Sequence, residues 1–91
     1  MKAKILILLP TLNEVHHVFS LYKKIISQKL NTDFLFIDDG STDGTWDIIK
    51  KIKRKNKEKV FIIRRNKREG LGKAHKDGLR WAYKKKYIYL I

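Results

Sequence analysis

Short apolar runs alternate along the chain with longer segments in which apolar residues recur every three or four positions. The runs begin at Ile5, Phe34, Val60 and Tyr87, and each has the length of a buried strand. The segments between them have the period of an amphipathic helix. We therefore predict the order strand, helix, strand, helix, strand, helix, strand.

The hydrophobic pattern also sets approximate bounds for these elements. Strands are expected over residues 5–9, 34–37, 60–63 and 87–91, and the first helix over residues 14–29. The second helix is expected to follow a cap at Ser41, Thr42 or Asp43. The positions that mark the three helices are Val15, Val18, Phe19, Tyr22, Ile25 and Ile26; then Trp46, Ile48, Ile49 and Ile52, predicted to point inward; then Leu71, Ala74, His75, Gly78, Leu79 and Ala82.

The connections are short enough that each helix must cross back over the sheet to the next parallel strand. The prediction is a three-layer α/β/α fold, one half of a doubly wound parallel sheet. Ligands of such sheets bind at the carboxyl ends of the strands. Three polar loops fall there, at residues 10–14, 38–43 and 64–72.

Composition narrows the class of protein without naming a partner. The 91 residues suffice for one small domain, and no apolar run is long enough to span a bilayer. We interpret the apolar residues after Met1 as a strand rather than a signal peptide, because Pro10 and polar residues replace a cleavage site. The chain has no cysteine, which excludes disulfides and thiolate metal sites. Its net charge of +13 attracts phosphates, nucleic acid or anionic lipid, although lysine runs are usually solvated helix faces.

The acidic loop that contains Asp38, Asp39 and Asp43 is the strongest candidate for chemistry. It is not a calcium loop of the EF-hand type, because Lys50 stands where a bidentate glutamate is required. It is not a phosphoacceptor site either, since the acids follow the second strand. We expect Asp39, held out by a glycine-rich turn, to accept hydrogen bonds from a nucleobase N–H or ribose hydroxyls. Asp38 is expected to stay at the sheet edge as an acceptor for loop amides.

For Glu14 and for the glycines at residues 70 and 72, the sequence allows either a structural or a ligand-binding role. Glu14 is either a first-turn acid that favours the helix dipole or a ligand contact beside Asp39. Gly70 and Gly72 either let the chain turn into the third helix or bring Lys73 and the helix start to phosphate oxygens. Neither the dinucleotide fingerprint nor the Walker loop is complete. The three histidines are predicted to lie on the surface or pack on helices, and Trp46 and Trp81 to belong to the core.

Three segments together carry a family resemblance. They are Leu9-Pro10-Thr11-Leu12-Asn13-Glu14, then Ile37-Asp38-Asp39-Gly40-Ser41-Thr42-Asp43-Gly44-Thr45, then Arg68-Glu69-Gly70-Leu71-Gly72-Lys73-Ala74. Along almost its whole length, the chain resembles the family 2 glycosyltransferases of GT-A fold. The third segment, with the Gly78-Leu79-Arg80-Trp81-Ala82 that follows, is most similar to the dolichyl- and polyprenyl-phosphate mannosyltransferase branch.

The resemblance implies an inverting transferase that moves a sugar from GDP-mannose or a UDP-sugar to a polyprenyl phosphate. By resemblance, the nucleotide contacts are Pro10, Leu12, Glu14, Ile37 and Asp39, although Leu12 stands where many relatives have tyrosine. The family also implies Mg²⁺ or Mn²⁺, held by an Asp-x-Asp segment that would follow the strand at residues 87–91. That segment is absent, so no metal ligand is assigned. A cytoplasmic protein is implied, peripheral at the cytoplasmic membrane face.

We expect residues 1–91 to form a single nucleotide-sugar-binding portion of a GT-A domain that ends before the Asp-x-Asp motif. The chain by itself is expected to transfer no sugar, because a metal that neutralises the departing diphosphate contributes several kcal/mol to the transition state. The competing hypothesis is a basic α/β module that binds nucleic acid or anionic lipid without catalysis. A third is a relic that folds and binds nothing. Under the first hypothesis no specific nucleic acid partner is expected.

Overall fold

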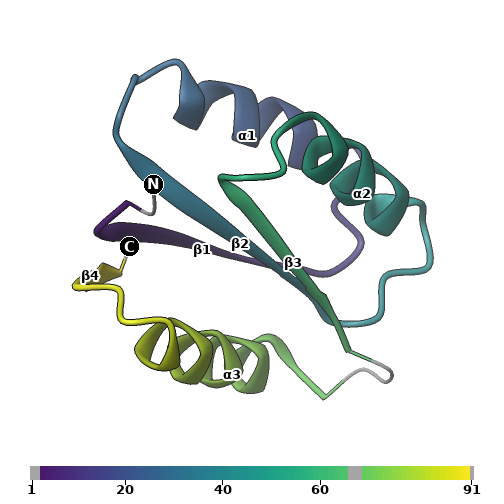
Figure 1. The fold of residues 1–91 in the computed structure, drawn as a ribbon. Coiled ribbons are helices and arrows are strands. Elements are labelled where there is room, and N and C mark those ends of the chain that lie inside the picture. Colours follow the sequence, from purple (N-terminus) through teal and green to yellow (C-terminus); the bar gives the residue numbers. More distant parts are fainter. Residues whose placement is uncertain (1–2, 66–68, 91) are drawn as a thin grey trace.

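The computed structural model describes residues 3–65 and 69–90 and confirms the predicted order of elements (Figure 1). Its helices and strands are β1 (Ile5–Thr11), α1 (Val18–Ile26), β2 (Thr32–Asp38), α2 (Thr45–Lys55), β3 (Val60–Arg64), α3 (Leu71–Lys84) and β4 (Tyr89–Leu90). The first two strands are longer than predicted. Arg68 of the third quoted segment and Ile91 of the fourth predicted strand lie outside the described residues.

The four strands form one parallel sheet in the order β3-β2-β1-β4. Helices α1 and α2 cover one face of this sheet, and α3 covers the other (Figure 1). The predicted three-layer α/β/α arrangement is therefore correct. Because the strands are parallel, β1, β2 and β3 all end at the same edge of the sheet, where the polar loops begin.

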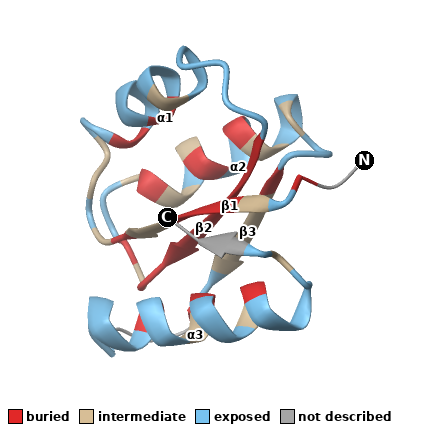
Figure 2. Ribbon diagram, turned by 90° about the vertical axis from the view of Figure 1, so that its left-hand side faces the viewer, coloured by how far each residue is buried: buried red, intermediate tan, exposed pale blue. Residues whose placement is uncertain are grey.

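Alternate residues of the central strands fill two separate cores. Ile7 of β1 and Phe34 and Phe36 of β2 pack against α1 and α2, whereas Leu6 and Leu35 pack against α3. Figure 2 shows buried residues along β1 and β2 and on the sheet-facing sides of the helices. Both faces of these strands are apolar, which is why their sequences are continuous apolar runs.

The first helix starts four residues later than predicted, at Val18 instead of Glu14. Asn13 adopts a left-handed conformation with φ of 51°. The next two amides, of Glu14 and Val15, donate to the side chains of Thr45, at the start of α2, and Asp43, in the loop after β2. Because tertiary acceptors take these amides, the chain makes a turn over residues 14–17 before it becomes helical. Glu14 is thus not a residue of the helix's first turn.

Several apolar residues that mark the predicted helices lie on the surface. Phe19 is 52% exposed, and Ile26, Leu71 and Leu79 are also exposed. The prediction that Trp46 and Trp81 belong to the core is confirmed, since both are partly buried against it. Helix α1 has nine residues and buries only the stripe that contains Val18 and Tyr22. A stripe this narrow leaves the neighbouring apolar positions uncovered.

A buried carboxylate joins the last strand to the amino-terminal edge of the sheet. Asp33, at the start of β2, accepts hydrogen bonds from the Tyr87 hydroxyl at 2.6 Å and from the Ala3 amide at 3.3 Å. Burial first, and then the hydrogen bond to Asp33, raise the pKa of Tyr87 well above its usual value. The phenol therefore stays protonated and can donate to Asp33 at all ordinary pH values.

Candidate nucleotide site at the carboxyl edge

The loop after β1 and the loop after β2 are joined by reciprocal hydrogen bonds. The Asn13 amide donates to Ser41 Oγ at 2.8 Å, and the Thr42 amide donates to Asn13 Oδ1 at 2.9 Å. The Glu14 amide donates to Thr45 Oγ1 at 2.8 Å. Two segments that are about thirty residues apart in the sequence therefore form one rigid rim.

Asp38 is the buried acceptor on which this rim rests. Its carboxylate accepts hydrogen bonds from Thr11 Oγ1 at 2.8 Å, the Ser41 amide at 2.8 Å and Ser41 Oγ at 2.6 Å. The side chain is fully buried. The prediction that Asp38 accepts loop amides at the sheet edge is confirmed.

Asp43 holds the start of α2. Oδ1 of Asp43 accepts from the amide and hydroxyl of Thr45, and Oδ2 accepts from the Val15 amide. Partial desolvation acts to raise the pKa of Asp43, but the hydrogen bonds from Thr45 and Val15 outweigh it and hold the pKa below its ordinary value. The residue at the helix cap is Gly44, with a φ of 100° that favours glycine, so the predicted cap at residues 41–43 is displaced by one position.

Asp39 differs from expectation, because its side chain is not held out into solvent but is fully buried. The amides of Glu69 and Gly70 donate to its two oxygens at 3.2 and 2.9 Å. The guanidinium of Arg65 lies beside it, with Nε 3.4 Å from Oδ1. The glycine-rich turn is as predicted, but the segment that leads into α3 covers the carboxylate.

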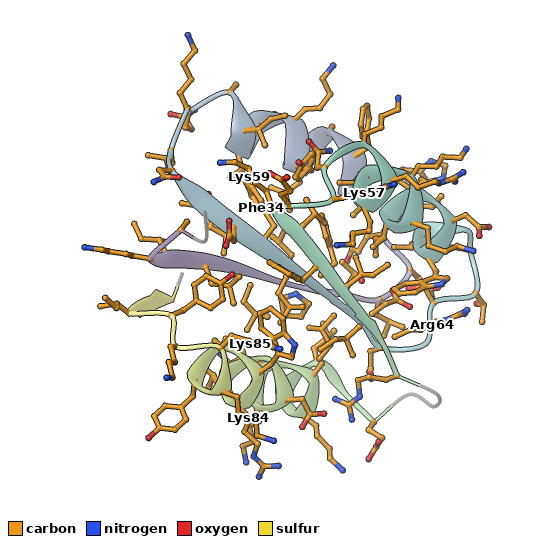
Figure 3. All side chains as sticks on the ribbon, viewed as in Figure 1. Phe34, Lys57, Lys59, Arg64, Lys84 and Lys85 are labelled. Carbon is orange, nitrogen blue, oxygen red and sulfur yellow. The ribbon has the colours of Figure 1, made fainter. Side chains whose placement is uncertain are left out.

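The end of β3 and the start of α3 close the third side of this edge. Arg64, labelled in Figure 3, donates from Nη2 to the Ser41 carbonyl at 3.1 Å, and its guanidinium lies over the Trp46 ring. Lys73 donates to Glu69 at 2.6 Å. Hydrogen bonds from Lys73 and then from Arg65 hold the pKa of Glu69 below its ordinary value. Lys73, which one interpretation brings to phosphate oxygens, is paired with the Glu69 carboxylate in this structure.

The structure brings only some of the five predicted nucleotide contacts to one hollow. Pro10 and Glu14 line a pocket of about 200 Å³ beside α1. Leu12 is half-buried in the adjacent loop. The side chain of Ile37 is fully buried in the core beneath α3. Asp39 is close to these residues along the sheet edge but is covered by Gly70.

Larger hollows lie away from this edge, including one of about 300 Å³ between α1 and α2 that Phe19 and Ile48 line together with lysine side chains. We place the candidate site at the carboxyl edge nevertheless. Hydrogen-bonding groups from three loops converge there, whereas the α1–α2 groove is mostly apolar. Recognition of a nucleotide depends on a few convergent polar groups.

Residues 3–65 and 69–90 contain no group of three or more histidine, cysteine, aspartate or glutamate side chains that could hold a metal ion. The carboxylates of Asp38 and Asp43 already accept protein hydrogen bonds. These two carboxylates therefore serve to hold the loops of this edge in place.

Three residues that build the site were not predicted from the sequence: Asn13, Thr45 and Arg65. Asn13 lies in a strand-to-helix turn, where asparagine is the usual non-glycine residue with positive φ, so its type was a usable signal. Thr45 looked like an ordinary first helical residue. Arg65 looked like one cation of a basic loop, and no local pattern distinguished it from Arg64.

The parallel sheet with polar loops at its carboxyl edge defines an α/β protein of the type that binds ligands at this edge. Residues 6–91 match the sequence profile of glycosyl transferase family 2. The chain belongs to this family.

Individual relatives and a solved structure extend this result. The chain is 35% identical over 85 residues to an uncharacterised protein of Methanocaldococcus jannaschii, covering 92% of this chain and 36% of that protein. It is 27% identical over 86 residues to the polyprenol monophosphomannose synthase of Mycolicibacterium smegmatis, covering 94% of this chain and 32% of that protein. The mannosyltransferase PcManGT from Pyrobaculum calidifontis, solved in complex with GDP-Man and Mn²⁺, has the same fold, with a TM-score of 0.79 at 21% identity over 90% of this chain. The chain spans about a third of these relatives and 25% of the solved chain.

Proposed function

We propose that this chain is the nucleotide-sugar-binding portion of an inverting glycosyltransferase that moves mannose from GDP-mannose to a polyprenyl phosphate. The observation that supports this most is the convergence of three loops, all matched by the family, at the carboxyl edge of one parallel sheet. The relatives add the sugar and the acceptor, because one is a polyprenol monophosphomannose synthase and another was solved with GDP-Man.

The residues of this edge suit a nucleotide rather than the reacting sugar. Pro10, Leu12, Glu14, Ile37 and Asp39 are the proposed contacts, with the Ile37 contact made by its backbone because its side chain is buried. A carboxylate accepts hydrogen bonds from the ring N–H of guanine or uracil. Asp39 would reach such a donor once the Glu69–Gly70 segment moves aside.

A divalent cation belongs to the proposal for the whole transferase. The Pyrobaculum mannosyltransferase is complexed with Mn²⁺, and the family implies Mg²⁺ or Mn²⁺. Such an ion would stabilise negative charge on the departing diphosphate. The residues described in this chain bind and orient the nucleotide in the proposal, and none of them is assigned as a ligand of the ion.

The titration of nucleotides separates this function from a general basic module. We expect GDP or UDP to bind at one site and Asp39→Ala to weaken that binding about tenfold or more, the effect of losing a hydrogen bond to a charged group. Asp47→Ala, which removes an exposed carboxylate on α2, is the matched control. The measurement is calorimetry with GDP, UDP and a short oligonucleotide at two salt concentrations. Binding of the oligonucleotide alone, falling steeply with salt, contradicts the proposal.

We further propose that the protein acts on the cytoplasmic side of the membrane and attaches peripherally through the outer face of α3. No helix in the two described ranges is long and apolar enough to cross a membrane. On α3 the exposed residues Leu79 and Tyr83 lie one turn apart, and Tyr83 is 86% exposed. Lys76, Arg80 and Lys84 are also exposed on this helix, and Figure 3 shows Lys84 pointing away from the sheet. Aromatic and cationic side chains together suit the surface of an anionic bilayer.

Sedimentation with lipid vesicles tests this attachment. The chain is expected to pellet with anionic vesicles and much less with neutral ones, and Leu79→Ser with Tyr83→Ser should reduce the bound fraction severalfold. The matched control is the pair Leu21→Ser and Leu30→Ser, two exposed apolar residues on the opposite side of the sheet. An equal loss in both pairs, or no loss in the α3 pair, contradicts the assignment of this face.

A further inference from the structure

Arg65, directly after β3, is a buried guanidinium that the proposed nucleotide contacts do not use. It is only 8% exposed. Its amide donates to the Asp38 carbonyl at 2.9 Å, so its backbone is fixed to the edge of the sheet. Burying a cation is costly unless carboxylates compensate it, which means that its surroundings must be organised around it.

Three carboxylates from three different segments surround this guanidinium. Nε lies 3.4 Å from Asp39, Nη2 lies 3.0 Å from Glu69 and Nη1 lies 3.3 Å from Asp77. Among the described residues, Nη1 has no hydrogen-bond acceptor in good geometry, so Asp77 compensates its charge as an ion pair only. A planar fork with five donors can serve three carboxylates at once, whereas a lysine ammonium cannot reach all three.

The contact with Asp39 is the one with a functional consequence. The amides of Glu69 and Gly70 each donate a hydrogen bond to one oxygen of Asp39, and the Arg65 guanidinium adds an ion pair to Oδ1. The two amides belong to the segment that covers Asp39, whereas Arg65 approaches from the strand. When that segment moves aside for a nucleotide, Arg65 is the partner that remains to orient the carboxylate.

We propose that Arg65 is a positioning residue for nucleobase recognition, acting through Asp39. This inference rests on the proposed function. It predicts selectivity, because guanine and uracil present a ring N–H to an oriented carboxylate, whereas adenine and cytosine present a ring nitrogen acceptor that a carboxylate repels. A site built to accept a hydrogen bond discriminates strongly against a ligand that lacks the donor.

The experiment compares the affinities of GDP and ADP for the wild-type chain and for Arg65→Gln. The wild type should prefer GDP by about tenfold or more. Arg65→Gln should bring the ratio close to one by weakening GDP binding while ADP binding stays the same. Asp39→Ala should do likewise, and the double variant should lose nothing further, because both substitutions remove one interaction. Arg54→Gln, which removes an exposed arginine of α2, is the matched control and should leave the ratio unchanged.

Arg65→Lys keeps the inference testable if Arg65→Gln does not fold. It retains a buried cation, and we expect a cooperative thermal transition together with loss of most of the preference for GDP. Parallel losses of GDP and ADP affinity would mean a structural role only and would overturn the inference, as would an unchanged ratio in Arg65→Lys. A wild-type chain that binds GDP no better than ADP contradicts the inference and the base contact in the proposed function together. A selective wild type with selective Arg65 variants contradicts the inference alone.

Discussion

Asp38→Ala is expected to destabilise the protein by about 3–5 kcal/mol, the cost of breaking a buried charged network. The substitution removes an acceptor that satisfies the Thr11 hydroxyl and both donors of Ser41. Water does not reach these groups, because Asp38, Thr11 and Ser41 are all buried. Each donor left without a partner costs about 1–3 kcal/mol, and a small domain has only about 5–15 kcal/mol in total.

Urea denaturation followed by tryptophan fluorescence measures this loss, since Trp46 and Trp81 lie on opposite faces of the sheet. Asp47→Ala is the matched control, because the Asp47 side chain is 73% exposed and its ion pair with Lys50, at 3.4 Å, lies on the surface. The control should change the free energy of unfolding by less than about 0.5 kcal/mol. Equal effects of the two substitutions would contradict the role assigned to Asp38.

Gly78→Ala is expected to cost about 1–3 kcal/mol, even though alanine is the better helix former. A Cβ at Gly78 would lie 2.5 Å from Cδ1 and 2.8 Å from Cδ2 of Leu8. Leu8 is a buried residue of β1 that belongs to the same core cluster as Ala74 and Ala82 of α3. The absence of a side chain at Gly78 is therefore what lets α3 lie close to the sheet.

Gly72→Ala in the same helix is the matched control. A Cβ there would meet nothing within 4 Å, and we expect no loss or a gain of up to about 1 kcal/mol. A second test uses Leu8→Ala, which should cost less in the Gly78→Ala background than in the wild type, because it relieves the overlap. If the two glycine variants have equal midpoints in urea denaturation, the close approach of α3 to β1 is not a constraint.

The regular elements could be predicted because their signals are local or periodic. A run such as Ile5–Leu9, followed by Pro10, is typical of a strand buried on both faces, and the structure has it. Helices α2 and α3 could be predicted from the helical period, because each buries a stripe of regularly spaced residues against the sheet. Short connections between parallel strands allow only a few sheet topologies, and the three-layer arrangement could be predicted for this reason.

The start of α1 and the burial of Asp39 could not be predicted because distant residues decide them. The amides of Glu14 and Val15 are taken by Thr45 and Asp43, about thirty positions later, so the helix is delayed. Asp39 is covered by Glu69 and Gly70, again thirty positions away. Phe19 stands at a position that fits the helical period, but it lies outside the narrow face that α1 buries against the sheet.

The five proposed nucleotide contacts lie in different surroundings at this edge. Pro10 and Glu14 line one hollow, as a shared role requires. Leu12 and Ile37 were assigned by family resemblance, and the burial of Ile37 leaves only its backbone for a contact. Asp39 has suitable chemistry but needs the Glu69–Gly70 segment to move, which makes its contact with the nucleotide a prediction about the bound state.

The most direct test of the central claim is to map GDP-mannose binding by nuclear magnetic resonance on the isotopically labelled chain. We expect the largest changes in amide chemical shift in the three loops at the carboxyl edge, including Glu69 and Gly70, whose amides leave Asp39. Asp39→Ala should abolish these changes at the same ligand concentration. Changes spread instead along the exposed lysines of α2 and α3, with the three loops unaffected, would contradict a nucleotide-sugar site at this edge.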